Sequence, residues 1–124
     1  MSANGLATVS RSLEPKYSEA LVNYRQQKYS EALQLLDELL AQESSIEFKE
    51  LKALTLKESG KLDKAAEVYE SLASSYPEQK ATYQFELGMI HFQQKDNDQA
   101  HDYFEKALAG NSIVTGKQIG RAHV

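Results

Sequence analysis

Residues 83–108 read YQFELGMIHFQQKDNDQAHDYFEKAL, and this stretch decides the fold of the chain. Apolar side chains recur at helical spacing on both sides of a polar segment, QQKDN, at residues 93–97. This pattern predicts two short helices joined by a tight turn. Gly88 and Ala100, one in each predicted helix, are small enough to let the two helices cross closely.

The same hairpin pattern occurs three times. Alanine opens each predicted second helix at Ala32, Ala65 and Ala100, with spacings of 33 and 35 residues. A small residue precedes each of these alanines by twelve positions, at Ala20, Ala53 and Gly88, and a bulky one follows four positions later, at Leu36, Tyr69 and Phe104. A period this regular indicates a helical repeat, and these residues are the expected core.

Capping and breaking residues mark the predicted helix ends. Ser44 with Glu47 has the spacing of a capping box, which predicts a helix start. Gly60 and Gly110 are expected to end helices, and Pro77 ends another. No segment before residue 112 has the alternation of a strand.

These residues resemble the tetratricopeptide repeat family, most closely at Leu87, Gly88, Ala100, Phe104 and Ala107. The resemblance implies an all-α fold: a right-handed α-solenoid of three antiparallel helix hairpins over residues 13–110. The predicted repeats cover about 13–45, 46–79 and 80–110, after a flexible N-terminus at 1–12.

Two departures from the family pattern accompany the resemblance. Glu19 stands where a leucine is usual. The tryptophan common in the first helix is replaced by Lys16, Lys49 and Gln84.

Residues 111–124 differ in composition from the rest of the chain. They contain no acidic residue, and Gly116 and Gly120 each cost about 1 kcal/mol in a helix interior. We therefore predict a non-helical tail, which is either native or added by recombinant cloning.

Charge and composition exclude several classes of function. Residues 1–110 hold 12 basic and 18 acidic residues, a net charge of −6, so direct binding of nucleic acid or anionic membranes is not expected. Cysteine is absent, which excludes disulfides and thiolate chemistry. The sequence shows no apolar run long enough to span a bilayer and no secretory signal, so a cytoplasmic location is the default prediction.

The family resemblance implies a concave groove, lined by the first helix of each hairpin, that binds peptides. The residues expected to face it are Tyr17, Leu21, Tyr24, Arg25, Glu47, Glu50, Leu54, Lys57, Phe85, Met89 and Phe92. Aromatic and methionine side chains suit contacts with extended peptides. The alternative is that Leu21, Leu54 and Met89 lie in the core between hairpins.

The expected ligand is an extended apolar, mildly basic peptide. Some family members hold C-terminal carboxylates with Lys, Asn and Arg, but the corresponding positions here include Leu21, Glu50, Thr82 and Phe85. Glu47 and Glu50 are expected to repel an acidic ligand and to attract a basic one. The chain is thus predicted to be a non-catalytic protein-binding adaptor with no cofactor and no metal.

Self-association is the alternative prediction, by two routes. Tyr103 and Leu108 are expected to be exposed at the last hairpin, where a second copy could cover them. The apolar tail residues Ile113, Val114 and Ile119, beside Lys117 and Arg121, match the expected ligand of the groove. The tail of a neighbouring copy is therefore one candidate ligand.

Overall fold

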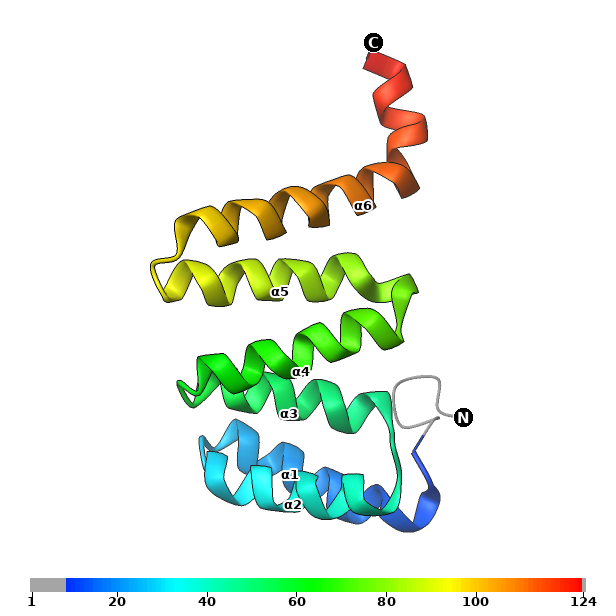
Figure 1. Cartoon of the computed structure of the whole chain (residues 1–124). Helices are drawn as coiled ribbons and strands as arrows, with labels where there is room; N and C mark the ends of the chain where they lie inside the picture. Colours follow the sequence, from blue (N-terminus) through cyan, green and yellow to red (C-terminus); the bar gives the residue numbers. More distant parts are fainter. Residues whose placement is uncertain (1–8, 124) are drawn as a thin grey trace. The chain divides into compact units, whose positions relative to one another are not determined.

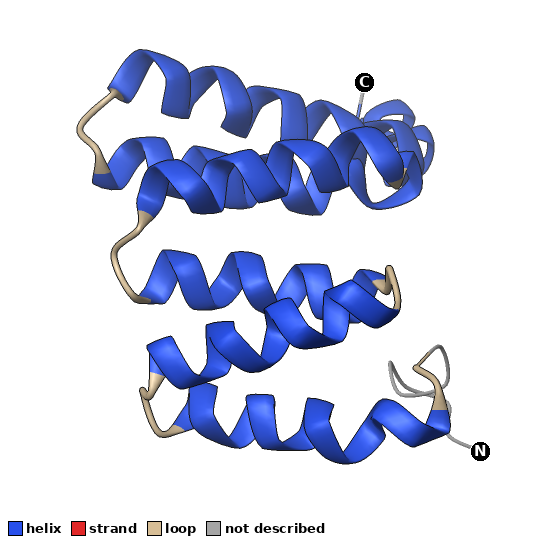
Figure 2. Cartoon of the chain, turned by 60° about the horizontal axis from the view of Figure 1, so that its bottom comes forward, coloured by secondary structure: helices blue, strands red, loops and turns tan. Residues whose placement is uncertain are grey.

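The computed structural model describes residues 9–123, with the backbone alone described for residues 111–123. Within this range the chain is all-α, as predicted: it forms helices joined by short loops, with no strand (Figures 1 and 2). The helices are α1 (Glu14–Arg25), α2 (Tyr29–Gln42), α3 (Ile46–Glu58), α4 (Leu62–Ser75), α5 (Lys80–Gln93) and α6 (Asn97–His123). Two short 3-10 segments, η2 (Arg11–Leu13) and η3 (Pro77–Gln79), precede α1 and α5.

The chain divides into two compact units, residues 1–68 and 69–124. In the first unit α1 packs against α2, and α2 packs against α3. In the second unit α5 packs against α6. The boundary falls inside α4, so its first half belongs to one unit and its second half to the other.

The core of the first unit is built from the predicted apolar faces. Leu36, Leu39 and Phe48 are fully buried, and the ring centroid of Tyr17 lies 5.3 Å from that of Phe48. Ala20, Ala32, Ala53 and Ala65 are fully buried as well, as expected of the small residues that allow close helix crossing.

The first described residues, 9–12, differ from the expectation of a flexible N-terminus at 1–12. Val9 is buried in the same core cluster as Leu13, one helical turn later. Ser10 donates a side-chain hydrogen bond to Glu43. Residues 9–12 therefore belong to the packed unit, because one buried valine and one hydrogen bond are enough to fix this short segment.

The three hairpin turns have the same backbone geometry. Gln27, Gly60 and Lys95 have φ of 63°, 88° and 64°. In each turn the next residue donates its backbone N–H to the carbonyl five positions earlier: Lys28 to Asn23, Lys61 to Leu56, and Asp96 to His91. This is the hydrogen bond that satisfies a free carbonyl at a helix end. The prediction that Gly60 ends a helix is confirmed, since α3 ends at Glu58.

Two predicted helix ends are wrong. The cap of α3 is Ser45 rather than Ser44: its Oγ accepts from the Glu47 backbone N–H at 3.2 Å and donates to Glu47 Oε1 at 2.8 Å. Serine can cap a helix N-terminus at either position. In the helix that starts at Ile46, Phe48 and Leu51 are buried.

The other error concerns the C-terminal segment. Helix α6 does not end at Gly110, and its backbone continues to His123 where we expected a non-helical tail. The segment after Gly110 contains no proline, so its glycines weaken the helix without interrupting the hydrogen bonds.

Candidate functional site

Three exposed apolar side chains of the second unit lie on α5. Phe85, Met89 and Phe92 follow one another at spacings of four and three residues, so they share one face of the helix. Phe85 is 50% exposed and Phe92 is 61% exposed. The buried residues of the same helix, Tyr83, Leu87 and Ile90, hold the opposite side. The sequence therefore supplies both a core face and an exposed aromatic face on one helix.

A hollow of about 510 Å³ opens beside Phe85. Its lining comes from α5 and α6: Ala81, Thr82, Phe85, Phe104, Ala107 and Leu108. The Phe85 and Phe104 ring centroids are 5.6 Å apart. Leu108 is 65% exposed at its edge. Phe104 was expected only as a core residue, and its part in this hollow was not foreseen.

Gly88 explains where Phe104 lies. A Cβ atom on Gly88 would lie 2.5 Å from Phe104 Cε1 and 2.6 Å from Cδ1, closer than side-chain carbon atoms approach one another. Glycine therefore gives the phenylalanine ring room to pack flat against α5, beside Phe85.

The α1 residues of the expected groove differ in exposure. Tyr17 is only 9% exposed and gives its ring to the core against Phe48. Leu21 and Tyr24 are half-buried and pack on that core, with Tyr24 6.1 Å from the Tyr29 ring. Arg25 is exposed. Tyr24 and Arg25 thus have accessible surface, whereas Tyr17 has little.

Four residues of α3 form a half-buried row at spacings of three, four and three: Glu47, Glu50, Leu54 and Lys57. Burial raises the pKa of Tyr17, and the charges of Glu47 and Glu50 raise this pKa further. The two carboxylates therefore lie close enough to α1 to affect its electrostatics. Glu47 and Glu50 therefore place negative charge beside Tyr17 in the first unit.

The structure brings the predicted groove residues into two sets. The α1 and α3 residues belong to the first unit, and the α5 residues belong to the second. Val22, which is 51% exposed, was not among the predicted groove residues. Its repeat equivalents, Thr55 and Ile90, are fully buried, so the repeat spacing predicts a buried Val22 and gives no signal of its exposure.

Tyr103, predicted for self-association, is half-buried and has several neighbours. Its ring stacks on His91 at 5.4 Å, its hydroxyl donates to Glu70 Oε2 at 3.4 Å, and Lys106 Nζ lies 5.4 Å from its centroid. Burial raises the pKa of Tyr103, and Glu70 raises it further. Ile113, Val114 and Ile119 lie outside the residues whose side chains the structure describes.

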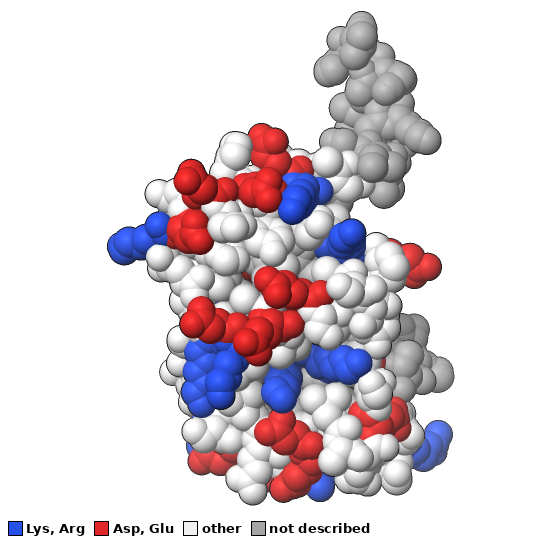
Figure 3. Space-filling view, in the orientation of Figure 1, with Lys and Arg blue, Asp and Glu red and all other residues white. Residues whose placement is uncertain are grey.

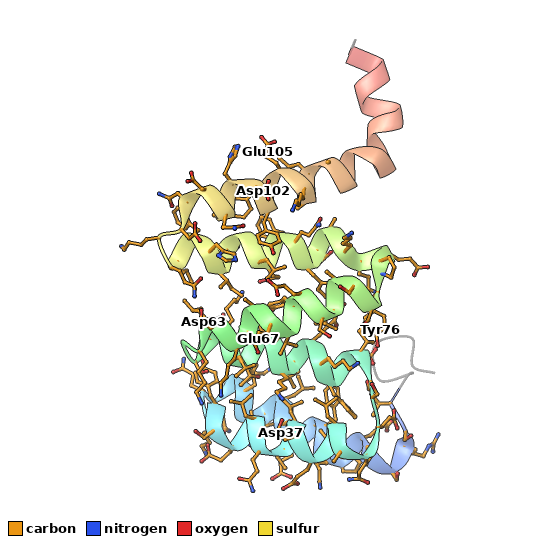
Figure 4. The ribbon with its side chains drawn as sticks, viewed as in Figure 1. Asp37, Asp63, Glu67, Tyr76, Asp102 and Glu105 are labelled. Atoms are coloured by element: carbon orange, nitrogen blue, oxygen red, sulfur yellow. The ribbon has the colours of Figure 1, made fainter. Side chains whose placement is uncertain are left out.

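The histidines of α5 and α6 make local contacts. His101 pairs with Glu105 at 3.3 Å, and Lys106 pairs with Asp102 at 3.2 Å, both across one helical turn. Figure 4 shows Asp102 and Glu105 on α6. His91 Nδ1 is buried, 3.7 Å from Asp96 Oδ2. Within the described residues no group of three His, Asp or Glu side chains is arranged to hold a metal ion.

No helix in the described part of the chain is both long and apolar enough to cross a membrane.

Comparisons with known proteins agree with this architecture. A family model described as "Tetratricopeptide repeat" matches residues 50–112. Human Superkiller complex protein 3 is 35% identical over 98 residues, a match that covers 78% of this chain and 6% of the human protein. The chain thus spans about 6% of the length of that relative.

A solved structure has a similar fold. It is the crystal structure of PcrH in complex with the chaperone binding region of PopB. The TM-score is 0.73 at 19% sequence identity, and the match covers 84% of both chains. At this identity the likeness is one of fold.

Proposed function

Because this chain belongs to the tetratricopeptide repeat family, we propose that it is a non-catalytic adaptor that binds an extended, apolar and mildly basic peptide in the concave groove implied by the family. The observation that carries the proposal is the exposed face of Phe85, Met89 and Phe92 on α5. Apolar side chains gathered on one exposed face are typical of interaction sites.

The electrostatics of the first unit support the basic character of the ligand. Glu47 and Glu50 lie on one face of α3, and their charges act on Tyr17 of α1. A lysine or arginine of the peptide would find favourable charge at these carboxylates. Tyr24 supplies further contact area, Arg25 and Lys57 can hold backbone carbonyls of the peptide, and Leu21 and Leu54 supply apolar area beside them.

The structural neighbour is consistent with this proposal. PcrH holds the chaperone binding region of PopB in the structure to which this chain is similar. A fold of this kind can therefore hold a segment of another protein.

Peptide binding measured by fluorescence anisotropy tests the proposal. The probe is a fluorescein-labelled peptide of about 12 residues that contains leucines and two lysines, with serine at the remaining positions. The control peptide has glutamates in place of the two lysines. We expect Phe85→Ala with Phe92→Ala to weaken binding at least about tenfold, since exposed aromatic anchors dominate such interfaces. Val22→Ala, which truncates an equally exposed side chain of the first unit, is the matched control.

A second set of binding measurements tests whether the negative charge of Glu50 contributes to peptide binding. Glu50→Gln should weaken binding of the lysine peptide and reduce its preference over the glutamate peptide. Equal affinity of the two peptides, or equal loss in the Val22→Ala control, would contradict the proposal.

Self-association is a second candidate function, favoured by Leu108 and the hollow beside it. A neighbouring copy could place residues 111–124 in the groove if this helical segment became extended, since it contains Ile113, Val114 and Ile119 beside Lys117 and Arg121 and has no acidic residue. If light scattering shows fewer copies per particle after deletion of 111–124, the tail is a ligand. If the number of copies is unchanged, the tail has no such role and the adaptor proposal stands.

A further inference from the structure

A second hollow, in the first unit, uses none of the groove residues. Its volume is about 860 Å³, within the range of about 300–1,000 Å³ typical of ligand sites. It is lined by α2, by α3, by Lys61 just before α4 and by the first half of α4 up to Val68. Its apolar lining includes Leu33 of α2 and Val68 of α4, which are half-buried, and Leu56 of α3, which is buried.

The carboxylates of α2 in this lining are already neutralised. Asp37 pairs with Lys52 at 2.9 Å, and Glu38 pairs with Lys16 at 3.0 Å. These two pairs leave the α2 side of the hollow without net charge.

On the α4 side of the hollow, the charged side chains are not neutralised in this way. Lys61 and Lys64 are exposed, and neither makes an ion pair with a residue that the structure describes. Glu67, one turn beyond Lys64, is the carboxylate of the lining that makes no ion pair with any described residue. The unpaired side-chain charges of the hollow are therefore two positive and one negative, although residues 1–110 carry a net charge of −6.

The pictures show the same distribution. In Figure 3 lysine and arginine side chains gather on this face of the first unit, with carboxylates beside them. Figure 4 places Asp37 on α2 and Glu67 on α4.

The length of the hollow limits what can occupy it. Its lining on α2 runs from Ser30 to Ala41, and at about 1.5 Å per residue these positions span about 17 Å. Three turns of an α-helix cover the same length. A helix that lays an apolar face against the half-buried Leu33 and Val68 would carry its polar side chains past Lys61 and Lys64.

We propose that this hollow is a second binding site, which takes an amphipathic helix of a partner protein with acidic side chains beside its apolar face. The apolar contacts supply the area removed from water, and the carboxylates of the partner pair with Lys61 and Lys64. The charge preference is opposite to that of the proposed groove, so the two sites select different partners.

The probe is a fluorescein-labelled helical peptide of about four turns, with leucines on one face and glutamates flanking them; a second peptide has lysines in place of the glutamates. We expect Lys61→Glu with Lys64→Glu to weaken binding of the glutamate peptide at least about tenfold and to improve binding of the lysine peptide. Added salt should weaken binding of the glutamate peptide to the unchanged protein.

The matched control is Lys80→Glu with Lys95→Glu, which makes the same change in charge on the second unit. Its effect should stay within about twofold, and circular dichroism of both double variants confirms that the helices are intact. Equal losses in the two double variants would overturn the proposal. Loss of glutamate-peptide binding in Phe85→Ala with Phe92→Ala would also overturn it, because the peptide would then bind on α5. If the groove proposal fails, the proposal of this second binding site still stands.

Discussion

At the scale of single residues, Gly88 has the clearest physical role. Its repeat equivalents are Ala20 and Ala53, yet a Cβ at Gly88 would meet the ring of Phe104. The first and second repeats have Leu36 and Tyr69 at the position of Phe104. The small residue and the bulky one must therefore be chosen together within each hairpin.

We predict that Gly88→Ala destabilises the protein. Overpacking costs about 1–3 kcal/mol, and alanine regains about 1 kcal/mol in helix propensity, so a net loss of up to about 2 kcal/mol is expected in urea denaturation. In the Phe104→Leu background the same change should cost less or become favourable. The same cost in both backgrounds would show that the ring is not the obstacle.

Tyr17 gives a pH-dependent prediction. Its pKa is raised in the folded chain by burial and by Glu47 and Glu50, so folding favours the protonated phenol. That contribution is complete below the ordinary tyrosine pKa of about 10 and is lost as the pH rises through the higher folded value. Tyr17→Phe should therefore make the alkaline loss of stability shallower.

Urea denaturation at several pH values between about 9 and 12 measures this difference. Tyr29→Phe removes a half-buried hydroxyl from the same unit and is the control. Parallel alkaline profiles for the unchanged protein and Tyr17→Phe would refute the prediction.

At the scale of helices and turns, the hairpin joints were only partly predictable. Gly60 predicts a left-handed turn because glycine adopts positive φ without strain. Gln27 and Lys95 adopt the same conformation as ordinary residues, and the sequence shows only that they lie in polar segments. Repeat spacing, rather than residue type, identifies these two turns.

Replacing the strained residues should stabilise the hairpins. A left-handed conformation costs an L-residue about 1–2 kcal/mol, and glycine loses part of this gain through the entropy of the unfolded chain. We expect Gln27→Gly and Lys95→Gly each to add up to about 1 kcal/mol of stability, and Gly60→Ala to remove about 1 kcal/mol.

Gln26→Gly is the matched control for this series, since Gln26 has φ of −84°. It should lower stability or leave it unchanged, measured by the urea midpoint. A gain at Gln26 as large as that at Gln27 would mean that positive φ is not the cause.

The faces of α5 and α1 were predicted with different accuracy. On α5 the sequence places Phe85, Met89 and Phe92 on one face, and the structure exposes all three. On α1 the same reasoning put Tyr17 beside the groove, whereas its ring is in the core. A shift of one residue in register is enough to move a side chain between these environments.

At the scale of the whole molecule, the last hairpin leaves apolar surface uncovered. Leu108 is exposed at a hollow lined largely by apolar side chains, whereas its repeat equivalent Ala73 is buried. We expect the chain to associate at high concentration and Leu108→Glu to return it to its monomer mass of 13.9 kDa. Light scattering measures this mass, and Val22→Glu is the control for an added charge at another exposed apolar residue.

The partner of the molecule lies beyond what the sequence determines. Repeat spacing fixes the hairpins because the small residues and turns recur at 33 and 35 residues. The exposed positions follow no such constraint, so their chemistry indicates a class of ligand rather than one protein.

The matching turns also bear on how such a chain can evolve. Each of the three joints closes through its own backbone hydrogen bond, between residues five apart in the sequence. A duplication or loss of one hairpin at the gene level therefore leaves every remaining joint intact. The number of hairpins can therefore change by unequal recombination while each turn keeps the hydrogen bond that reverses the chain. The length of the repeat array can then vary with the size of the bound partner.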